Sequence, residues 1–181
     1  MDLPPLEHFG PRIMVCGTSN TGKSTLAVAM GKRLERAVVH LDQLHFAPHT
    51  DWQERPKDEF VALHREAIAG ESWIIEGNYS RVIGERLARA TGIILLSSNR
   101  FANFGRYVRR TVFERDSRLG NLAGNRDSLK WSMVTWVLLQ GPRNIARYRT
   151  MLPASGLPFL ELRSMREVRR AYAAWGLTFP A

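Results

Sequence analysis

The residues of this chain that most clearly predict chemistry form a glycine-bounded segment near its start. Gly17 and Gly22 flank four small or polar residues, and Lys23 and Ser24 follow directly. Glycines let the backbone turn with no side chain in the way, so that successive N–H groups point toward one anion. A lysine at this spacing reaches the outer phosphates of a nucleotide, and the serine hydroxyl binds Mg²⁺. The segment therefore predicts a site for ATP and Mg²⁺. The predicted nucleotide-binding residues are Gly17, Thr18, Ser19, Asn20, Thr21, Gly22, Lys23, Ser24 and Thr25.

Two acidic residues follow apolar runs that we expect to be strands. Asp42 comes after residues 37–41, and Glu76 comes after residues 73–75. In open parallel sheets, ligands bind beyond the carboxyl ends of the strands. We therefore predict that Glu76 organises Mg²⁺ together with Ser24, and that Asp42 orients a substrate hydroxyl or acts as a base toward it. A loop-capping role is the alternative for Asp42.

Arginines crowd the stretch of chain after the fourth apolar run. They are Arg100, Arg106, Arg109, Arg110, Arg115, Arg118 and Arg126. Arg106 and Arg110 are four residues apart, so on a helix they share one face. Two guanidinium groups on one face suit the negative charge of a phosphoryl group in transfer. We expect residues 99–126 to form an arginine-rich lid; a solvated basic face is the alternative. The predicted catalytic residues are Lys23, Asp42, Arg106 and Arg110.

The apolar pattern predicts the elements that position these residues. Short apolar runs at 12–16, 37–41, 73–75, 92–96 and 158–162 are typical of buried strands. Helical spacing covers 23–36, 57–69, 81–90, 99–115, 127–140, 143–151 and 164–175, with Gly141-Pro142 expected to end the helix over 127–140. Residues 43–56 and 116–126 are predicted loops, and 43–70 are expected to cover the acceptor. Alternating strands and helices predict one α/β domain over residues 1–181, with a parallel sheet covered on both faces.

Composition and charge exclude several classes of protein. The single cysteine, Cys16, excludes an intramolecular disulfide and any zinc site built from several cysteines. Neither a signal-peptide pattern nor an apolar run of about 20 residues is seen, so we expect a cytoplasmic protein without a membrane span. The net charge of +9 is uneven: residues 1–99 hold 11 basic and 12 acidic residues, whereas residues 100–181 hold 15 and 5. A basic second half suits polyphosphate chemistry or a nucleic-acid backbone.

Three segments together resemble a known family. They are residues 17–25, His40-Leu41-Asp42, and the run from Trp73 to Tyr79. They resemble the adenylate-kinase-like P-loop proteins of the DNA topology modulation type, over roughly residues 12–115. The resemblance implies the nucleoside-monophosphate-kinase fold, with three α/β/α layers, five parallel strands in the order 2-3-1-4-5 and a lid after the fourth strand. It also implies that Glu76 organises Mg²⁺ and substrate, that Arg106 and Arg110 are lid arginines, and that Asp42 binds substrate.

These patterns favour an enzyme that transfers the γ-phosphoryl group of ATP to a small acceptor. The acceptor is a nucleotide, a nucleoside or a metabolite with a hydroxyl group. Asn78-Tyr79-Ser80 stands where adenylate kinases have Phe-Pro-Arg, which argues against AMP. A nucleotide-regulated nucleic-acid-binding protein is the alternative, although no helix-turn-helix or zinc pattern supports it. A slow ATPase with a regulatory role is a third possibility.

Overall fold

The computed structural model describes residues 3–50, 52–97 and 141–179. The expected lid with Arg106 and Arg110, and the helix expected over 127–140, lie outside these residues. The strands are β1 (Arg12–Gly17), β2 (Val38–His40), β3 (Trp73–Glu76), β4 (Gly92–Leu96) and β5 (Phe159–Leu162). The helices are α1 (Lys23–Leu34), α2 (Leu41–His45), α3 (Lys57–Ala69), α4 (Ile83–Arg89), α7 (Gly141–Met151) and α8 (Met165–Ala174). Two short 3₁₀ helices are η1 (Leu6–Phe9) and η3 (Pro153–Ser155).

The strands of the described residues form one sheet in the order β2-β3-β1-β4-β5, and every neighbouring pair is parallel. The central strand β1 sets Val15 beside Glu76 of β3 and Gly17 beside Leu96 of β4. The carboxyl ends of β1, β3 and β4 therefore meet at one edge of the sheet. The predicted fold class and strand order are confirmed.

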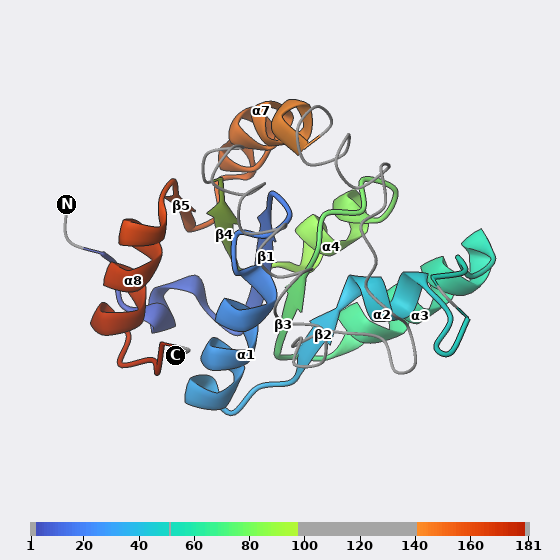
Figure 1. The fold of residues 1–181 in the computed structure, drawn as a ribbon, viewed down its shortest axis with the longest axis horizontal. Coiled ribbons are helices and arrows are strands. Elements are labelled where there is room, and N and C mark those ends of the chain that lie inside the picture. Colours follow the sequence, from blue (N-terminus) through green and yellow to red (C-terminus); the bar gives the residue numbers. More distant parts are fainter. Residues whose placement is uncertain (1–2, 51, 98–140, 180–181) are drawn as a thin grey trace, which may run out of the picture.

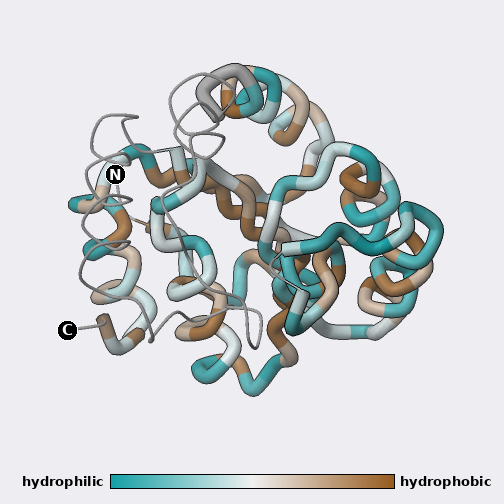
Figure 2. The backbone as a smooth tube through the Cα atoms, turned by 45° about the vertical axis from the view of Figure 1, so that its right-hand side comes forward, coloured by the Kyte–Doolittle hydropathy of each residue, from teal (hydrophilic) through white to brown (hydrophobic). Residues whose placement is uncertain are grey.

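The alternation of side chains along β1 explains why helices cover both faces of the sheet. Ile13 and Val15 pack with α1, α8 and η1, whereas Met14 and Cys16 pack with α3, α4 and α7. In Figure 1, α1 and α8 lie to one side of the strands, and α3 and α4 lie to the other. Figure 2 shows the hydrophobic segments gathered at the centre of the molecule. The two apolar faces of one central strand thus produce a three-layer domain.

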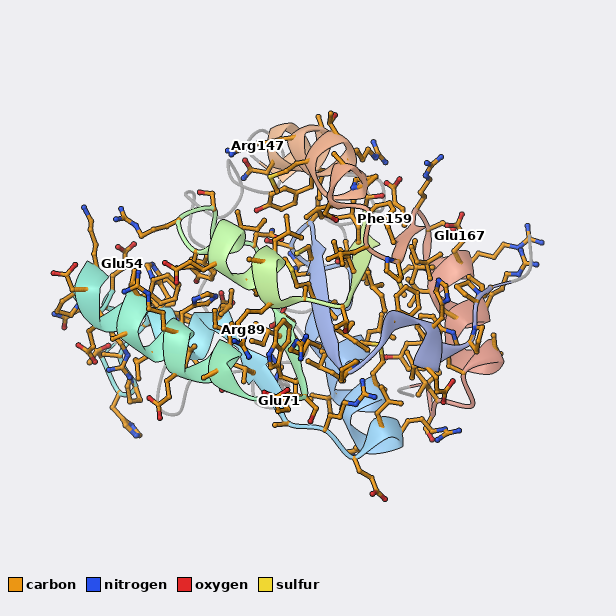
Figure 3. All side chains as sticks on the ribbon, turned by 180° about the vertical axis from the view of Figure 1, so that it is seen from behind. Glu54, Glu71, Arg89, Arg147, Phe159 and Glu167 are labelled. Atoms are coloured by element: carbon orange, nitrogen blue, oxygen red, sulfur yellow. The ribbon has the colours of Figure 1, made fainter. Side chains whose placement is uncertain are left out.

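The helices α3 and α4 lie side by side, as the view from behind in Figure 3 shows. Arg65 of α3 donates two hydrogen bonds to Glu85 of α4, at 2.9 and 2.8 Å. Arg89 also reaches back to the carbonyl of Ala69 at 3.1 Å. Exposed ion pairs of this kind add little stability, so the buried apolar contacts are what hold this layer on the sheet.

Most predicted elements agree with the structure, including α3 over 57–69 and β4 over 92–96. One expectation was wrong. Residues 43–45 are helical rather than loop, because the chain turns into α2 where Leu41 packs against Gly77. Asp42 therefore lies in the first turn of a helix. The helix α7 begins at Gly141, two residues before the helix expected over 143–151. The helix that Gly141-Pro142 was expected to end lies outside the described residues.

Among the described segments, no helix has both the length and the apolar composition needed to span a bilayer.

Candidate functional site

The glycine-bounded segment joins β1 to α1, and its two glycines have conformations that favour glycine. Gly17 has a φ of 145° and Gly22, the residue before α1, has a φ of 85°. A Cβ atom on Gly17 would lie 2.1 Å from the carbonyl oxygen of Leu96. The N–H of Thr18 donates to that same oxygen at 3.0 Å. The loop therefore starts pressed against the end of β4, where only glycine fits.

The interior of the loop is closed by two hydrogen bonds to one carbonyl. The Lys23 ammonium donates to the carbonyl of Thr18 at 2.9 Å, and the Thr21 hydroxyl donates to the same oxygen at 2.8 Å. An ammonium group has three donors, so Lys23 keeps capacity for phosphate oxygens. The N-terminus of α1, which has twelve residues, starts at Lys23 and adds its positive dipole end. The loop thus has the features of an anion site.

Ser24 and Glu76 are brought together as the sequence predicts. The Ser24 hydroxyl donates to Oε1 of Glu76 at 2.9 Å, and Nδ1 of His40 lies 3.0 Å from the same oxygen. Glu76 is 4% exposed. Burial raises its pKa, but the His40 hydrogen bond and the charge of Lys23 outweigh burial, and the net pKa is lowered. A buried, ionised carboxylate therefore sits beside the loop at neutral pH.

The donor set at this position fits Mg²⁺ only together with phosphate. One hydroxyl and one carboxylate converge there, and the described residues contain no group of three or more His, Cys, Asp or Glu side chains that could hold a metal ion. Mg²⁺ commonly binds one or two protein oxygens and takes its remaining ligands from water and substrate phosphates. Ser24 and Glu76 suit that mode and do not suit a site made of protein alone.

Asp42 pairs with Tyr79, a residue that sequence reasoning gave no role. The Tyr79 hydroxyl donates to Oδ1 of Asp42 at 2.7 Å. Burial raises the pKa of Tyr79 well above its usual range, and the Asp42 carboxylate raises it further. Tyr79 therefore stays a neutral donor and fixes one oxygen of Asp42. The sequence did offer one signal for Tyr79, because this residue belongs to the run from Trp73 to Tyr79 that carries the family resemblance.

The aromatic ring of Tyr79 also anchors the segment expected to cover the acceptor. Its ring centroid lies 4.7 Å from that of His45 and 5.2 Å from that of Phe60. A β-bridge between Phe46 and Glu54 closes the loop between α2 and α3. Tyr79 therefore contacts both ends of the segment that joins α2 to α3, and the same residue binds Asp42.

A second missed residue is Asn78, which follows Gly77 after β3. Its side-chain amide accepts from the N–H of Gly17 at 3.0 Å and donates to the carbonyl of Gly17 at 2.8 Å. Cys16, just before, is fully buried, and its Sγ lies 3.8 Å from the carbonyl of Gly77. Burial raises the pKa of the Cys16 thiol, so it stays protonated and unreactive. Asn78 and Gly17 lie so far apart in the chain that no sequence pattern connects them.

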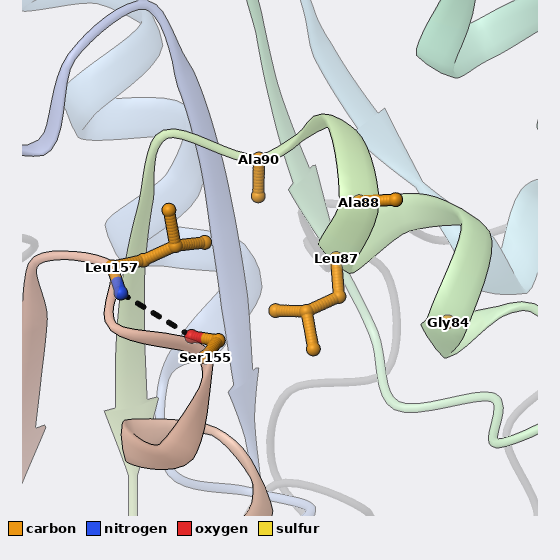
Figure 4. A pocket seen from close by; sticks show the side chains of 6 residues that line it. All are labelled: Gly84, Leu87, Ala88, Ala90, Ser155 and Leu157. Atoms are coloured by element: carbon orange, nitrogen blue, oxygen red, sulfur yellow. Dashed lines mark hydrogen bonds between the residues drawn. The ribbon is translucent and has the colours of Figure 1, made fainter.

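A shallow groove of about 450 Å³ lies away from these residues (Figure 4). It is lined by Gly84, Leu87, Ala88, Ala90, Ser155 and Leu157, between α4 and the start of β5. Its walls carry no charged side chain and none of the predicted site residues. The predicted site residues that the structure describes therefore lie at the sheet edge and not in this groove.

No family model and no curated protein sequence matches this chain. Several solved structures are similar to this chain. A gluconokinase from Sinorhizobium meliloti 1021 matches with a TM-score of 0.56 and 15% identity, over 92% of this chain and 91% of that one. A candidate kinase from Chloroflexus aurantiacus j-10-fl matches with a TM-score of 0.50 and 12% identity, over 90% and 97%. At such identities these likenesses show the fold, which is that of P-loop kinases.

Proposed function

We propose that this protein is a kinase that transfers the γ-phosphoryl group of ATP to a hydroxyl group of a small metabolite. One observation carries the proposal: a buried carboxylate, Glu76, reaches the hydroxyl of Ser24 at the foot of a glycine-bounded anion loop. An anion loop alone would only bind phosphate. An acid placed at its serine supports magnesium-dependent chemistry on the bound nucleotide.

The nucleotide would be held mainly by backbone groups. The amides of residues 19–24 and the dipole of α1 would bind the phosphates, and Lys23 would reach the outer ones. The amide of Thr18, which the sequence also suggested, is instead bonded to the carbonyl of Leu96. Ser24 would bind Mg²⁺, and Glu76 would hold it through water. Mg²⁺ bound there would supply neutralisation of the negative charge on the phosphates. The predicted lid residues Arg106 and Arg110, outside the described residues, would complete that neutralisation.

The acceptor would bind next to Asp42. Tyr79 donates to one oxygen of this carboxylate. Among the described residues the other oxygen has no hydrogen-bond partner, so it would accept a proton or a hydrogen bond from a hydroxyl. In the reaction, the acceptor oxygen bonds to the γ-phosphorus, the bond from that phosphorus to the β,γ-bridging oxygen breaks, and ADP leaves. The hydroxyl proton passes to Asp42. The fold likeness to a gluconokinase supports a polyhydroxy acceptor. A nucleoside or a nucleotide is the alternative, in keeping with the resemblance to adenylate-kinase-like proteins.

A coupled assay of ADP release tests the proposal. The purified full chain is incubated with ATP and Mg²⁺ against a panel of sugar acids, sugars, nucleosides and nucleotides. We expect one class to stimulate ADP release strongly, and we expect Lys23→Ala to abolish both turnover and ATP binding by calorimetry. ADP release that no acceptor increases would instead indicate a slow ATPase. Absence of any ATP binding would remove the proposal altogether.

A further inference from the structure

The start of the phosphate-binding loop is held from two sides. On one side, the carbonyl of Leu96 accepts from the N–H of Thr18. On the other side, the amide of Asn78 makes both possible bonds to Gly17, accepting from its N–H and donating to its carbonyl. Gly17 thus has its peptide groups fixed by β4 and by the segment after β3. The direction of the following amides depends on this residue, because it is where the backbone leaves the sheet.

Asn78 is itself held in place through its own carbonyl. The Tyr148 hydroxyl of α7 donates to this carbonyl at 3.1 Å. Arg86 of α4 donates from Nη2 to the carbonyl of Gly77 at 3.0 Å and to that of Asn78 at 3.4 Å. Two helices of the same layer therefore converge on the turn formed by Gly77 and Asn78.

Arg86 is an unusual residue for this position. Its side chain is fully buried, and its Nε and Nη1 have no hydrogen-bond partner within the described part of the chain. A buried guanidinium is costly unless its donors are used and its charge is opposed. Within the described part of the chain, its hydrogen bonds end on the carbonyls of Gly77 and Asn78. The buried guanidinium therefore holds this turn in position.

We propose that Asn78 locks the start of the phosphate-binding loop in its nucleotide-binding geometry, and that Arg86 and Tyr148 are positioning residues that act through Asn78. The role in binding rests on the proposed function. An amide side chain suits the task because it presents one donor and one acceptor, as a peptide group does. Aspartate keeps the acceptor, loses the donor and adds a negative charge beside the phosphates. Alanine loses both bonds.

Calorimetry with MgATP tests the effect on binding. We expect Asn78→Ala to weaken binding by about tenfold, the effect of losing one to two hydrogen bonds, and Asn78→Asp to weaken it further. The KM for ATP should rise while the KM for the acceptor stays unchanged, which a general loss of folding would not produce. Asn144→Ala on α7, whose side chain makes no hydrogen bond to these residues in the described part of the chain, is the matched control and should bind as the parent does.

Hydrogen exchange without nucleotide tests the lock itself, independently of any activity. We expect Asn78→Ala to speed exchange in peptides over residues 13–25 and to leave peptides of α8 unchanged. Tyr148→Phe should act in the same direction but less strongly, and should add nothing in the Asn78→Ala background. Arg86→Lys should preserve protection better than Arg86→Met, because lysine keeps a donor and a charge.

The two measurements separate the outcomes. If the parent protein binds no nucleotide yet Asn78→Ala speeds loop exchange, the lock stands and the proposed function fails. If the parent binds MgATP and Asn78→Ala binds it equally well, the positioning role is overturned. Unchanged exchange over residues 13–25 in a folded Asn78→Ala variant overturns the lock itself.

Discussion

The Ser24 hydroxyl and the Glu76 carboxylate lie 2.9 Å apart although they are 52 positions apart in the sequence. Their meeting follows from the parallel register of β1 and β3, which sets Val15 beside Glu76 and so brings the loop after β1 next to the acid at the end of β3. His40, from the edge strand β2, fixes the same carboxylate oxygen from the other side. Three neighbouring segments thus contribute one group each.

Removing the charge of Glu76 should impair catalysis more than nucleotide binding. We expect Glu76→Gln to lower kcat by at least about 100-fold and to raise the Mg²⁺ concentration needed for half-maximal rate, because the neutral amide holds metal-bound water poorly. Binding of ATP without Mg²⁺ should change little. The measurement is initial rate against Mg²⁺ concentration, with the exposed Glu71→Gln as control. Equal Mg²⁺ dependence in the Glu76 variant and in the parent would contradict this role.

Loss of the Tyr79 hydroxyl should act on the acceptor and not on ATP. We expect Tyr79→Phe to raise the KM for the acceptor and to lower kcat about tenfold, because Asp42 loses the hydrogen bond that orients it. The KM for ATP should stay within about twofold. Steady-state kinetics with each substrate varied in turn measures both. An altered KM for ATP with an unchanged KM for the acceptor would place the Asp42–Tyr79 pair outside the acceptor site.

The conformation of Gly17 makes a sharp test of the loop. Gly17→Ala would place a Cβ atom 2.1 Å from the carbonyl oxygen of Leu96 at a φ of 145°. We expect a loss of about 3 kcal/mol or more of unfolding free energy, or a displaced loop that no longer binds ATP. Urea unfolding and calorimetry distinguish the two. Gly84→Ala, where an added Cβ meets nothing within 4 Å, is the control and should be stabilising by about 0.5–1 kcal/mol.

The buried His64 should make stability depend on pH. Burial, and next the charge of Arg86, lower the pKa of His64 to about 4, whereas an unfolded histidine has a pKa of about 6.5. The unfolded state therefore takes up a proton first as the pH falls below about 6.5, and the folded state loses stability until about pH 4, where it protonates too. From about pH 7.5 to about pH 5 the loss from this group is of the order of 2 kcal/mol.

Urea unfolding followed by circular dichroism at the two pH values measures this loss. The comparison is with His64→Leu, which fills the same buried position without a titrating group. We expect the leucine variant to lose less stability between the two pH values than the parent, by roughly the same 2 kcal/mol. An identical loss in both proteins would show that His64 does not stay neutral in the fold.

Local pattern explains which features of this protein the sequence predicted. The glycine-bounded loop, the apolar strands and the start of the helix expected over 164–175 all depend on residues close in the chain. At that start, the Ser164 side chain accepts from the N–H of Glu167 at 3.2 Å. Strand ends also placed Glu76 correctly, because parallel topology collects them at one edge. The order of the sheet followed from the resemblance to a known family.

The remaining parts of the site depend on contacts that no local pattern encodes. Asn78 and Gly17 are 61 positions apart, and a polar residue after a strand is common in loops. An arginine on a helix is usually exposed, yet Arg86 is buried and donates to the carbonyls of the turn after β3. The helical position of Asp42 arose because Leu41 packs against Gly77, a contact between separate strand ends.

The buried position of Cys16 makes its thiol a probe of motion at the base of the loop. It is the sole thiol of the chain and immediately precedes Gly17, so a small disulfide reagent reaches it only when the base of the loop transiently opens. Its modification rate thus reports opening of the loop base without any introduced label. Ligands that tighten the loop should slow the reaction, and a screen for the unidentified acceptor needs only a colorimetric reading of the released thiolate.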